Sequence, residues 1–170
     1  LIYSYEAFKL APRDASDFVL GNGNTDADTD GTISDIQQGN VSTGATVTVK
    51  DVVVTAIQRN GSNIEAMYVS EMITAAAPYT GIYVKLAQQV PQATYAVGDK
   101  LTISGIYEEF FDASQISASS LTKDGTAALP TPALIADPCT IATKFVPDGS
   151  NWTPGDTHGA QAESYEGVLV

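Results

Sequence analysis

The chain has 170 residues and a formal net charge of −12, with eight lysines and arginines against twenty aspartates and glutamates. This length suits one globular domain with a sizeable core, or one domain with flanking pieces of its neighbours. Neutralisation of phosphates supplies most non-specific affinity for nucleic acids. Because the few basic residues are also far apart in sequence, we expect no nucleic-acid partner. No apolar run is long enough to span a bilayer.

The two ends of the chain carry apolar patterns. Residues 1–10 fit either a strand or a short helix, which Pro12 ends. The chain begins without methionine and stops in the apolar run 167–170, which looks like the opening of a strand. We therefore expect an excised or processed piece that associates with itself or with neighbouring domains by β-strand pairing.

A ladder of carboxylates follows the N-terminal segment. Asp26, Asp28 and Asp30 alternate along the chain and Gly31 follows them, as in the first half of a calcium loop. The bidentate glutamate that closes such a loop is replaced by a glutamine, and Asp35, two residues earlier, is the expected substitute. We predict a Ca²⁺ site made by these four aspartates. The alternative is an acidic, solvated turn, since Asp, Gly and Thr favour turns.

The middle of the chain predicts a mostly β fold. Residues 32–38 indicate a short helix that Gly39 closes. Short β-branched runs then follow, with a hairpin signal at Asn60-Gly61 and a bulge signal at Gly105. The predicted strands include 45–57, 64–69, 81–86 and 100–106. A bent, five-stranded meander of this length can close into a small barrel.

The composition changes after this region. From residue 122 to residue 138 the chain is rich in Pro, Ala and Thr, which indicates an extended crossing or linker segment. We therefore divide the chain into an N-terminal extension (1–24), a calcium loop with a β-barrel (25–121), and an extended linker with the start of a further strand (122–170).

The residues that hydrolases and zinc sites need are scarce. Cys139 and His158 are the only cysteine and histidine, too few soft ligands for zinc, and His158 has no recognisable nucleophile beside it. Cys139 either fills apolar space or pairs with a cysteine outside this chain. Among so many acids, the pair Glu108 and Glu109 has no special weight as a glycosidase-type pair. We expect no enzyme and no catalytic residues.

Several segments together resemble a known type of domain. They are 32–37, 47–49 with 52–56, 81–84, 97–105 and 107–111. These segments resemble the OB-fold domains of secreted bacterial proteins, of the type found beside extracellular endonuclease/exonuclease domains and in surface proteins without one. The resemblance covers roughly residues 32–117. It implies a mostly β, OB-fold-like, five-stranded barrel, here with N- and C-terminal strand-like extensions.

The resemblance also implies where a ligand would bind. OB-folds commonly bind oligonucleotides or sugars across strands 2 and 3, with aromatic side chains as stacking platforms. Tyr68, Tyr79 and Tyr83 lie on or beside these strands, and Lys85 follows on the same face. Tyr68, Tyr83 and Lys85 are the candidate ligand-binding residues. The alternative is that the tyrosines are ordinary packing and surface residues.

We expect a non-enzymatic, secreted or cell-surface module, stabilised by Ca²⁺, with a structural or assembly role in a tandem array or an extracellular fibre. The abundance of Thr and Ser, the scarcity of lysine and the calcium loop all suit an extracellular setting. The alternative is an accessory nucleic-acid- or glycan-binding domain of a secreted nuclease.

Overall fold

A computed structural model describes residues 3–4, 8–9, 29–111, 113–136 and 164–170. The helix and strands in these ranges are β1 (Tyr3–Ser4), β2 (Phe8–Lys9), β3 (Thr29–Asp30), α1 (Ile33–Gln37), β4 (Thr46–Asn60), β5 (Asn63–Glu71), β6 (Gly81–Pro91), β7 (Asp99–Phe110) and β8 (Ala113–Thr126). No helix among these residues is long and apolar enough to cross a membrane.

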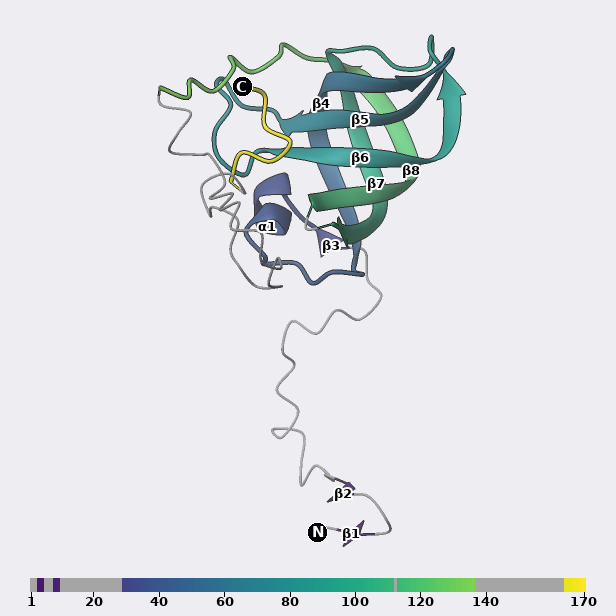
Figure 1. The fold of residues 1–170 in the computed structure, drawn as a ribbon, viewed down its shortest axis with the longest axis vertical. Coiled ribbons are helices and arrows are strands. Elements are labelled where there is room, and N and C mark those ends of the chain that lie inside the picture. Colours follow the sequence, from purple (N-terminus) through teal and green to yellow (C-terminus); the bar gives the residue numbers. More distant parts are fainter. Residues whose placement is uncertain (1–2, 5–7, 10–28, 112, 137–163) are drawn as a thin grey trace, which may run out of the picture.

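Five long strands form a closed barrel (Figure 1). The strands follow one another in the order β4-β5-β6-β8-β7, and β7 pairs with β4 to complete the ring. All neighbouring pairs in the ring are antiparallel except β6 with β8, which is parallel. This is the arrangement of a small OB-fold-like Greek-key barrel, so the predicted fold class is confirmed.

The barrel closes because β4 bends. Its first half pairs with β7 and its second half pairs with β5. Between the register pairs Val49↔Ile103 and Val52↔Leu101, β4 advances three residues and β7 only two. The extra residue is a β-bulge, and Asp51 there has a φ of 53°. In a regular strand without the bulge, Asp51 would face inward at the position that Val52 now holds.

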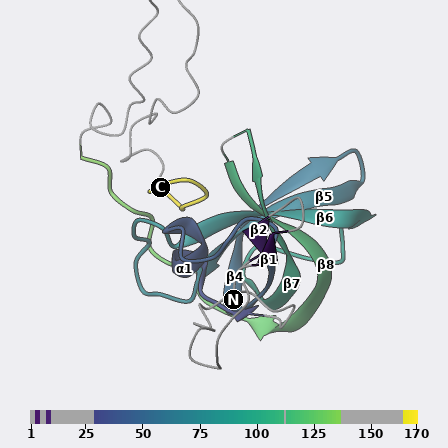
Figure 2. The same cartoon turned by 90° about the horizontal axis from the view of Figure 1, so that it is seen from below.

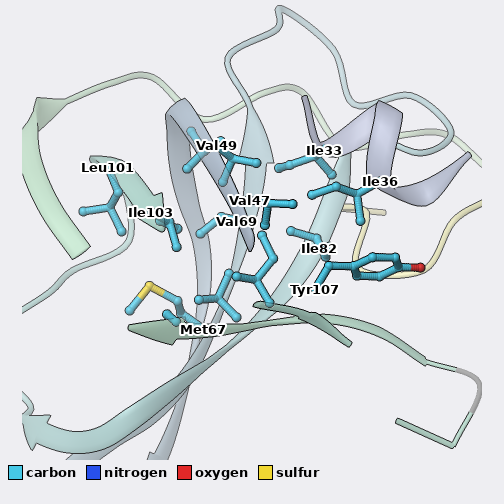
Figure 3. Packing of buried hydrophobic residues seen from close by; sticks show 14 of the residues in the cluster. Ile33, Ile36, Val47, Val49, Met67, Val69, Ile82, Leu101, Ile103 and Tyr107 are labelled. Carbon is cyan, nitrogen blue, oxygen red and sulfur yellow. The ribbon is translucent and has the colours of Figure 1, made fainter. Parts of the chain in front are cut away.

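The barrel interior is filled by aliphatic side chains from every strand (Figure 3). The largest fully buried members of the cluster include Ile33, Ile36, Ile64, Met67, Ile82, Leu101, Ile103 and Ile116. On β6, Ile82, Val84 and Leu86 are buried while Tyr83 and Lys85 face outward. This is the alternation that the sequence predicts for β6, and it places Tyr83 and Lys85 together on the outer face.

Helix α1 covers one end of the barrel (Figures 1 and 2). Ile33 and Ile36 on its inner face belong to the core. A capping box begins the helix: Thr32 Oγ1 accepts from Asp35 N, and the Asp35 carboxylate accepts from Thr32 N. These contacts confirm the predicted short helix, and they give Asp35 a structural role.

Two predictions about the later strands were wrong. The barrel is not a meander, because the chain crosses one end after β6 and β7 then lies between β4 and β8. The boundary between residues 121 and 122 falls inside β8, which stays paired with β7 as far as Thr126. Polar side chains dominate the end of β8 because they face solvent, and the sequence therefore looks like a linker there.

The bulge predicted at Gly105 is present. The register of β7 with β8 shifts between Ser104 and Gly105, and the extra residue is Ser119 of β8. A Cβ on Gly105 would lie 2.4 Å from the carbonyl oxygen of Ser117 and 2.8 Å from the Cα of Ala118. The two backbones therefore approach too closely for any side chain at position 105.

The C-terminal segment, defined as residues 164–170, forms a turn and no strand, which corrects the prediction that a further strand begins there. Ala133 N donates to Leu169 O at 2.9 Å, and Tyr79 N donates to Ser164 O at 2.6 Å. Val168 is buried. The segment therefore packs against the barrel and the preceding extended chain. At the other end of the sequence, β1 and β2 pair antiparallel.

We predict that Gly105→Ala lowers the free energy of unfolding by about 1–3 kcal/mol, the usual range for overpacking a close contact. Chemical denaturation measures the change. Ser120→Ala is the matched control, because Ser120 is exposed on the neighbouring strand. Equal stability of the two variants would contradict the close approach of β7 and β8.

Candidate functional site

A groove of about 390 Å³ crosses the outer face of the barrel. Its lining side chains come from all five barrel strands and from the C-terminal segment. We call it the aromatic groove, and it is lined by Gln58, Tyr68, Tyr83, Lys85, Phe110, Ala113, Ser114, Gln115, Glu166 and Gly167. The three predicted ligand-binding residues, Tyr68, Tyr83 and Lys85, are all among them.

The two tyrosines form the centre of the aromatic groove. Tyr68 and Tyr83 are direct partners across β5 and β6, and their rings pack edge to face with centroids 5.2 Å apart. The Tyr83 hydroxyl donates to Gln58 Oε1 at 3.2 Å, while Gln58 Nε2 donates to Glu65 Oε1 at 2.5 Å. This chain of hydrogen bonds fixes the orientation of the Gln58 amide and holds the Tyr83 ring in place.

Partial burial raises the pKa of Tyr83 above its ordinary value, and the neighbouring Tyr68 and Glu65 raise it further. Each of these causes disfavours the phenolate. Tyr83 therefore stays protonated at neutral pH and keeps its hydroxyl as a hydrogen-bond donor.

Two phenylalanines extend the aromatic surface beyond the tyrosines. The Lys85 ammonium lies 6.0 Å from the centroid of the Phe110 ring, and Phe110 packs edge to face with Phe111 at 4.7 Å. Phe110 is 56% exposed and Phe111 is 90% exposed. Phe111 also has a φ of 53°, which is costly for a bulky residue. Tyr107, in the same stretch of the chain, is buried, so the two phenylalanines differ from it in facing solvent.

Carboxylates of β7 hold the polar side chains at the end of the aromatic groove. Gln115 Nε2 donates to Glu108 Oε2 at 3.0 Å, and Ser114 Oγ donates to Glu109 Oε1 at 2.8 Å. The buried Tyr107 hydroxyl also donates to Glu109. Burial, followed by this hydrogen bond, raises the pKa of Tyr107. These partners give Ser114 a fixed structural environment.

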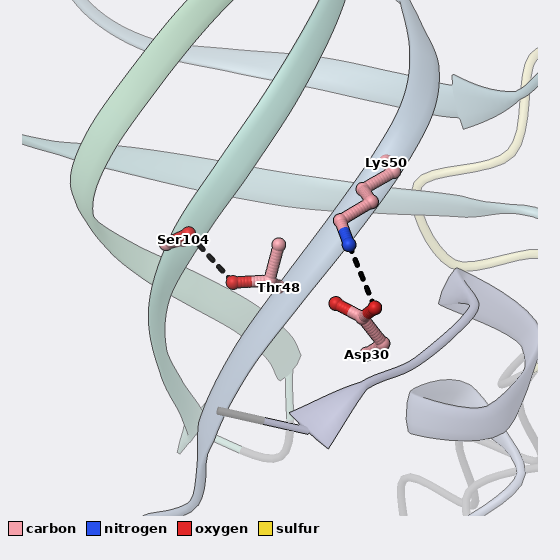
Figure 4. Close-up of polar contacts among 4 residues, drawn as sticks. All are labelled: Asp30, Thr48, Lys50 and Ser104. Atoms are coloured by element: carbon pink, nitrogen blue, oxygen red, sulfur yellow. Dashed lines mark hydrogen bonds and ion pairs between the residues drawn. The ribbon is translucent and has the colours of Figure 1, made fainter. Parts of the chain in front are cut away.

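A second concavity, of about 440 Å³, lies beside β3 and the start of α1. We call it the acidic pocket because it is lined by Asp30, Asp35, Asp51 and Glu71. Lys50 Nζ lies 2.6 Å from Asp30 Oδ2 (Figure 4), and Lys100 Nζ lies 2.8 Å from Asp51 Oδ1.

The other two carboxylates of the acidic pocket hold α1. Glu71 Oε1 accepts from Ser34 N at 2.8 Å. The Asp35 carboxylate accepts from the hydroxyl of Thr32 as well as from its backbone N–H. The hydrogen bond from the hydroxyl is the main reason why the pKa of Asp35 lies below its ordinary value.

The acidic pocket contains two of the four predicted calcium ligands, Asp30 and Asp35. The other two, Asp26 and Asp28, lie outside the described residues, as do Cys139 and His158. Within the described ranges, no three His, Cys, Asp or Glu side chains are grouped closely enough to hold a metal ion. Ligation by all four aspartates therefore stays a prediction.

The sequence alone did not identify the other seven lining residues of the aromatic groove, which include Gln58, Phe110, Gln115 and Glu166. The sequence did carry a signal for Phe110. Consecutive side chains of a strand point to opposite faces, so Phe110 and Phe111 cannot both point into the core. Glu166 had no such signal, since its position depends on how the C-terminal segment folds back. Tyr79, which we considered with the other tyrosines, does not line the aromatic groove.

Solved structures with a similar fold share little sequence with this chain. A chain of a replication protein A heterotrimer bound to ssDNA is 18% identical, with a TM-score of 0.41 over 54% of this chain and 76% of that one. The hypothetical protein ygiW from E. coli is 13% identical, with a TM-score of 0.39 over 56% and 89% of the two chains. A DUF3299 family protein from Pseudomonas aeruginosa PAO1 is 16% identical, with a TM-score of 0.37 over 70% and 87%.

No family model and no curated protein matches the chain. Since these TM-scores are below 0.5, the three structures do not indicate a ligand. The OB-like character of the barrel rests on its own strand order and pairing.

Proposed function

We propose that this chain is a non-enzymatic binding module that holds a ring-bearing ligand in the aromatic groove. The observation that carries the proposal is the pair Tyr68 and Tyr83 on the outer face of the barrel, with Lys85 and Phe110 beside them. Ligand sites in proteins commonly combine aromatic surface with a few fixed polar groups. The aromatic groove has both, because Gln58 and Gln115 are held by hydrogen bonds.

The polar groups of the aromatic groove support binding better than catalysis. Ser114 is buried and donates to a carboxylate, and the two amides are neutral. A hydrolytic nucleophile needs a base that accepts its proton and is itself oriented by a third group. Glu109 already accepts from both Ser114 and Tyr107, so it acts as a structural acceptor in this proposal.

We propose further that Ca²⁺ stabilises the module through Asp26, Asp28, Asp30 and Asp35, and that the parent protein is secreted or displayed on a cell surface. The position of Asp30 and Asp35 in one acidic pocket supports the ion site. Calcium would have to displace Lys50 from Asp30. The side chain of Lys50 is 55% exposed and that of Asp30 is 66% exposed. Such exposed ion pairs contribute little, so the displacement costs little.

A structural or assembly role is the second candidate function. Leu134 is 91% exposed and Val170 is 61% exposed. The residues that precede them in the chain, Ala133 and Leu169, are joined by a backbone hydrogen bond. Exposed apolar side chains gathered at one place are typical of contact surfaces. A second copy or a neighbouring domain would cover them.

The binding proposal predicts that Tyr83→Ala weakens the ligand. Loss of one stacked ring should cost about 0.5–1.5 kcal/mol, roughly two- to twelvefold in Kd. The ligand is to be found with an immobilised array of glycans and single-stranded oligonucleotides, and Kd measured by calorimetry. Tyr83→Phe should keep the stacking, and Met72→Ala, exposed outside the aromatic groove, should have no effect. Full affinity in Tyr83→Ala would exclude the aromatic groove.

The calcium proposal predicts a higher melting temperature in millimolar calcium than in chelator. Binding to the folded state alone stabilises it by about 2.7 kcal/mol when free calcium exceeds Kd a hundredfold. The double variant Asp26→Asn with Asp28→Asn should remove the difference without touching the capping box of α1. Identical melting curves of the wild type in both buffers would rule out the site.

The assembly candidate predicts concentration-dependent association in sedimentation-velocity experiments. Leu134→Ser should reduce the association, because it removes an exposed apolar side chain. Leu129→Ser, a less exposed leucine of the same extended stretch (44%), is the control. A single monomeric species at every concentration, with and without calcium, would contradict the assembly role.

A further inference from the structure

Phe111 lies at the tip of the hairpin between β7 and β8, directly after the last residue of β7. Its side chain is 90% exposed, and its ring packs edge to face on the ring of Phe110. Its φ of 53° is a conformation that a bulky residue adopts only at a cost. The single chain therefore gains little from this ring and carries backbone strain at the same residue. Strain of this kind gathers at functional sites, which indicates a role for Phe111 outside its own chain.

The aromatic groove lies next to this tip. Phe110 belongs to its lining, whereas Phe111 does not. Concavities of about 390 Å³ are large enough to hold small organic molecules, so the aromatic groove has room for a phenylalanine ring. The rings of Tyr68 and Tyr83 in its lining suit the edge-to-face contacts that aromatic rings prefer. One chain thus carries, side by side, an exposed aromatic ring and a concavity that fits such a ring.

This arrangement favours a second copy of the chain as the partner. A copy turned by 180° can place its Phe111 in the aromatic groove of the first chain. Because the ring and the groove lie on the same face, the groove of the second copy then receives Phe111 of the first chain in the same way. Such an isologous contact closes as a dimer and leaves no further ring or groove unoccupied.

The charges beside the aromatic groove are complementary across the same contact. The Lys85 ammonium lies over the Phe110 ring, and no carboxylate of the described residues forms an ion pair with it. Glu109 is exposed, and it accepts only from the hydroxyl groups of Tyr107 and Ser114, both at Oε1. No ion pair within the described ranges involves Glu109 either. Each chain thus has a cation and an anion at this face that a second copy can pair.

We propose that two copies of this chain associate through a twofold contact in which Phe111 of each copy enters the aromatic groove of the other, with Lys85 beside Glu109 of the opposite copy. The inference rests on the assembly role and deepens it, and it does not need the binding function. It locates the contact at the aromatic groove and not at Leu134 and Val170. Because each groove is filled by the ring of the other copy, a dimer and a ligand in the groove exclude each other.

The test measures the association of the full-length chain by sedimentation velocity over a range of concentrations. Phe111→Asn removes the ring and suits the backbone, because asparagine tolerates a positive φ, so this variant should melt no lower than the wild type. Met72→Asn is the matched control, since Met72 is an exposed apolar residue outside the aromatic groove. Glu109→Gln removes the charge and keeps an acceptor for Tyr107 and Ser114.

We expect the wild type to form a dimer. Phe111→Asn should raise the dimer Kd by about a hundredfold or more, because both buried rings are lost. Glu109→Gln should raise it by about threefold, as the loss of two partly exposed ion pairs does. Met72→Asn should leave the dimer Kd unchanged.

A mixture of two variants tests the contact itself. Tyr83→Ala damages the aromatic groove and keeps Phe111, whereas Phe111→Asn keeps the groove. Each variant alone loses both contacts of its dimer. The mixed dimer keeps one intact contact, because both substitutions fall on the other one. With one variant carrying a fluorophore, we expect the mixed dimer to be about tenfold or more tighter than the dimer of either variant.

Two results would overturn the inference while the assembly role stands. One is association of Phe111→Asn that is as strong as that of the wild type, and the other is a mixed dimer no tighter than the dimers of the separate variants. A wild type that stays monomeric at every concentration would contradict both the inference and the assembly role. The binding function would stand in each of these cases, because its test is the effect of Tyr83→Ala on ligand affinity.

Discussion

The bend in β4 is the constraint on which the rest of the structure depends. One strand can border two different neighbours only if it changes direction, and the extra residue at Lys50–Asp51 produces that change while it keeps the apolar face of the strand directed inward. Val47 and Val49 before the bulge and Val52 after it thus enter the same core. Closing the ring through β4 and β7 removes the free sheet edges that a flat five-stranded sheet would expose.

Closure also decides where the aromatic groove lies. Since β6 pairs with β5 on one side and with β8 on the other, the outward side chains of three strands meet on one convex face. Tyr68 and Tyr83 meet there because they are cross-strand partners, and Phe110, the last residue of β7, lines the same groove. The C-terminal segment then completes the aromatic groove from outside the barrel. A rigid scaffold with fixed polar groups lowers the cost of ordering a binding site.

The sequence was sufficient for features that depend on local periodicity and turn chemistry. The alternation in β6, the hairpin between β4 and β5, and the capped helix α1 each follow from residues close together in the chain. The hairpin signal at Asn60-Gly61 is one residue out of register, because Asn60 pairs with Asn63 and the two turn residues are Gly61 and Ser62. The order of the strands and the end of β8 depend on pairing between distant segments, which periodicity does not encode. Tyr68, Tyr83 and Lys85 were predictable as one surface. Glu166 was not, because contacts between distant segments, such as that between Gly81 and Gly167, bring it there.

The central claim is that a closed barrel presents one ligand-binding face, across β5, β6 and the C-terminal segment. The most direct measurement is a titration of the isotope-labelled chain with the tightest-binding ligand from the glycan and oligonucleotide array, followed by two-dimensional NMR. We predict that the largest shift changes occur at Gln58, Tyr68, Tyr83, Lys85 and Glu166, with little change at the acidic pocket. Shift changes confined to the acidic pocket or to the opposite face, with Tyr68 and Tyr83 unaffected under saturating ligand, would contradict this account.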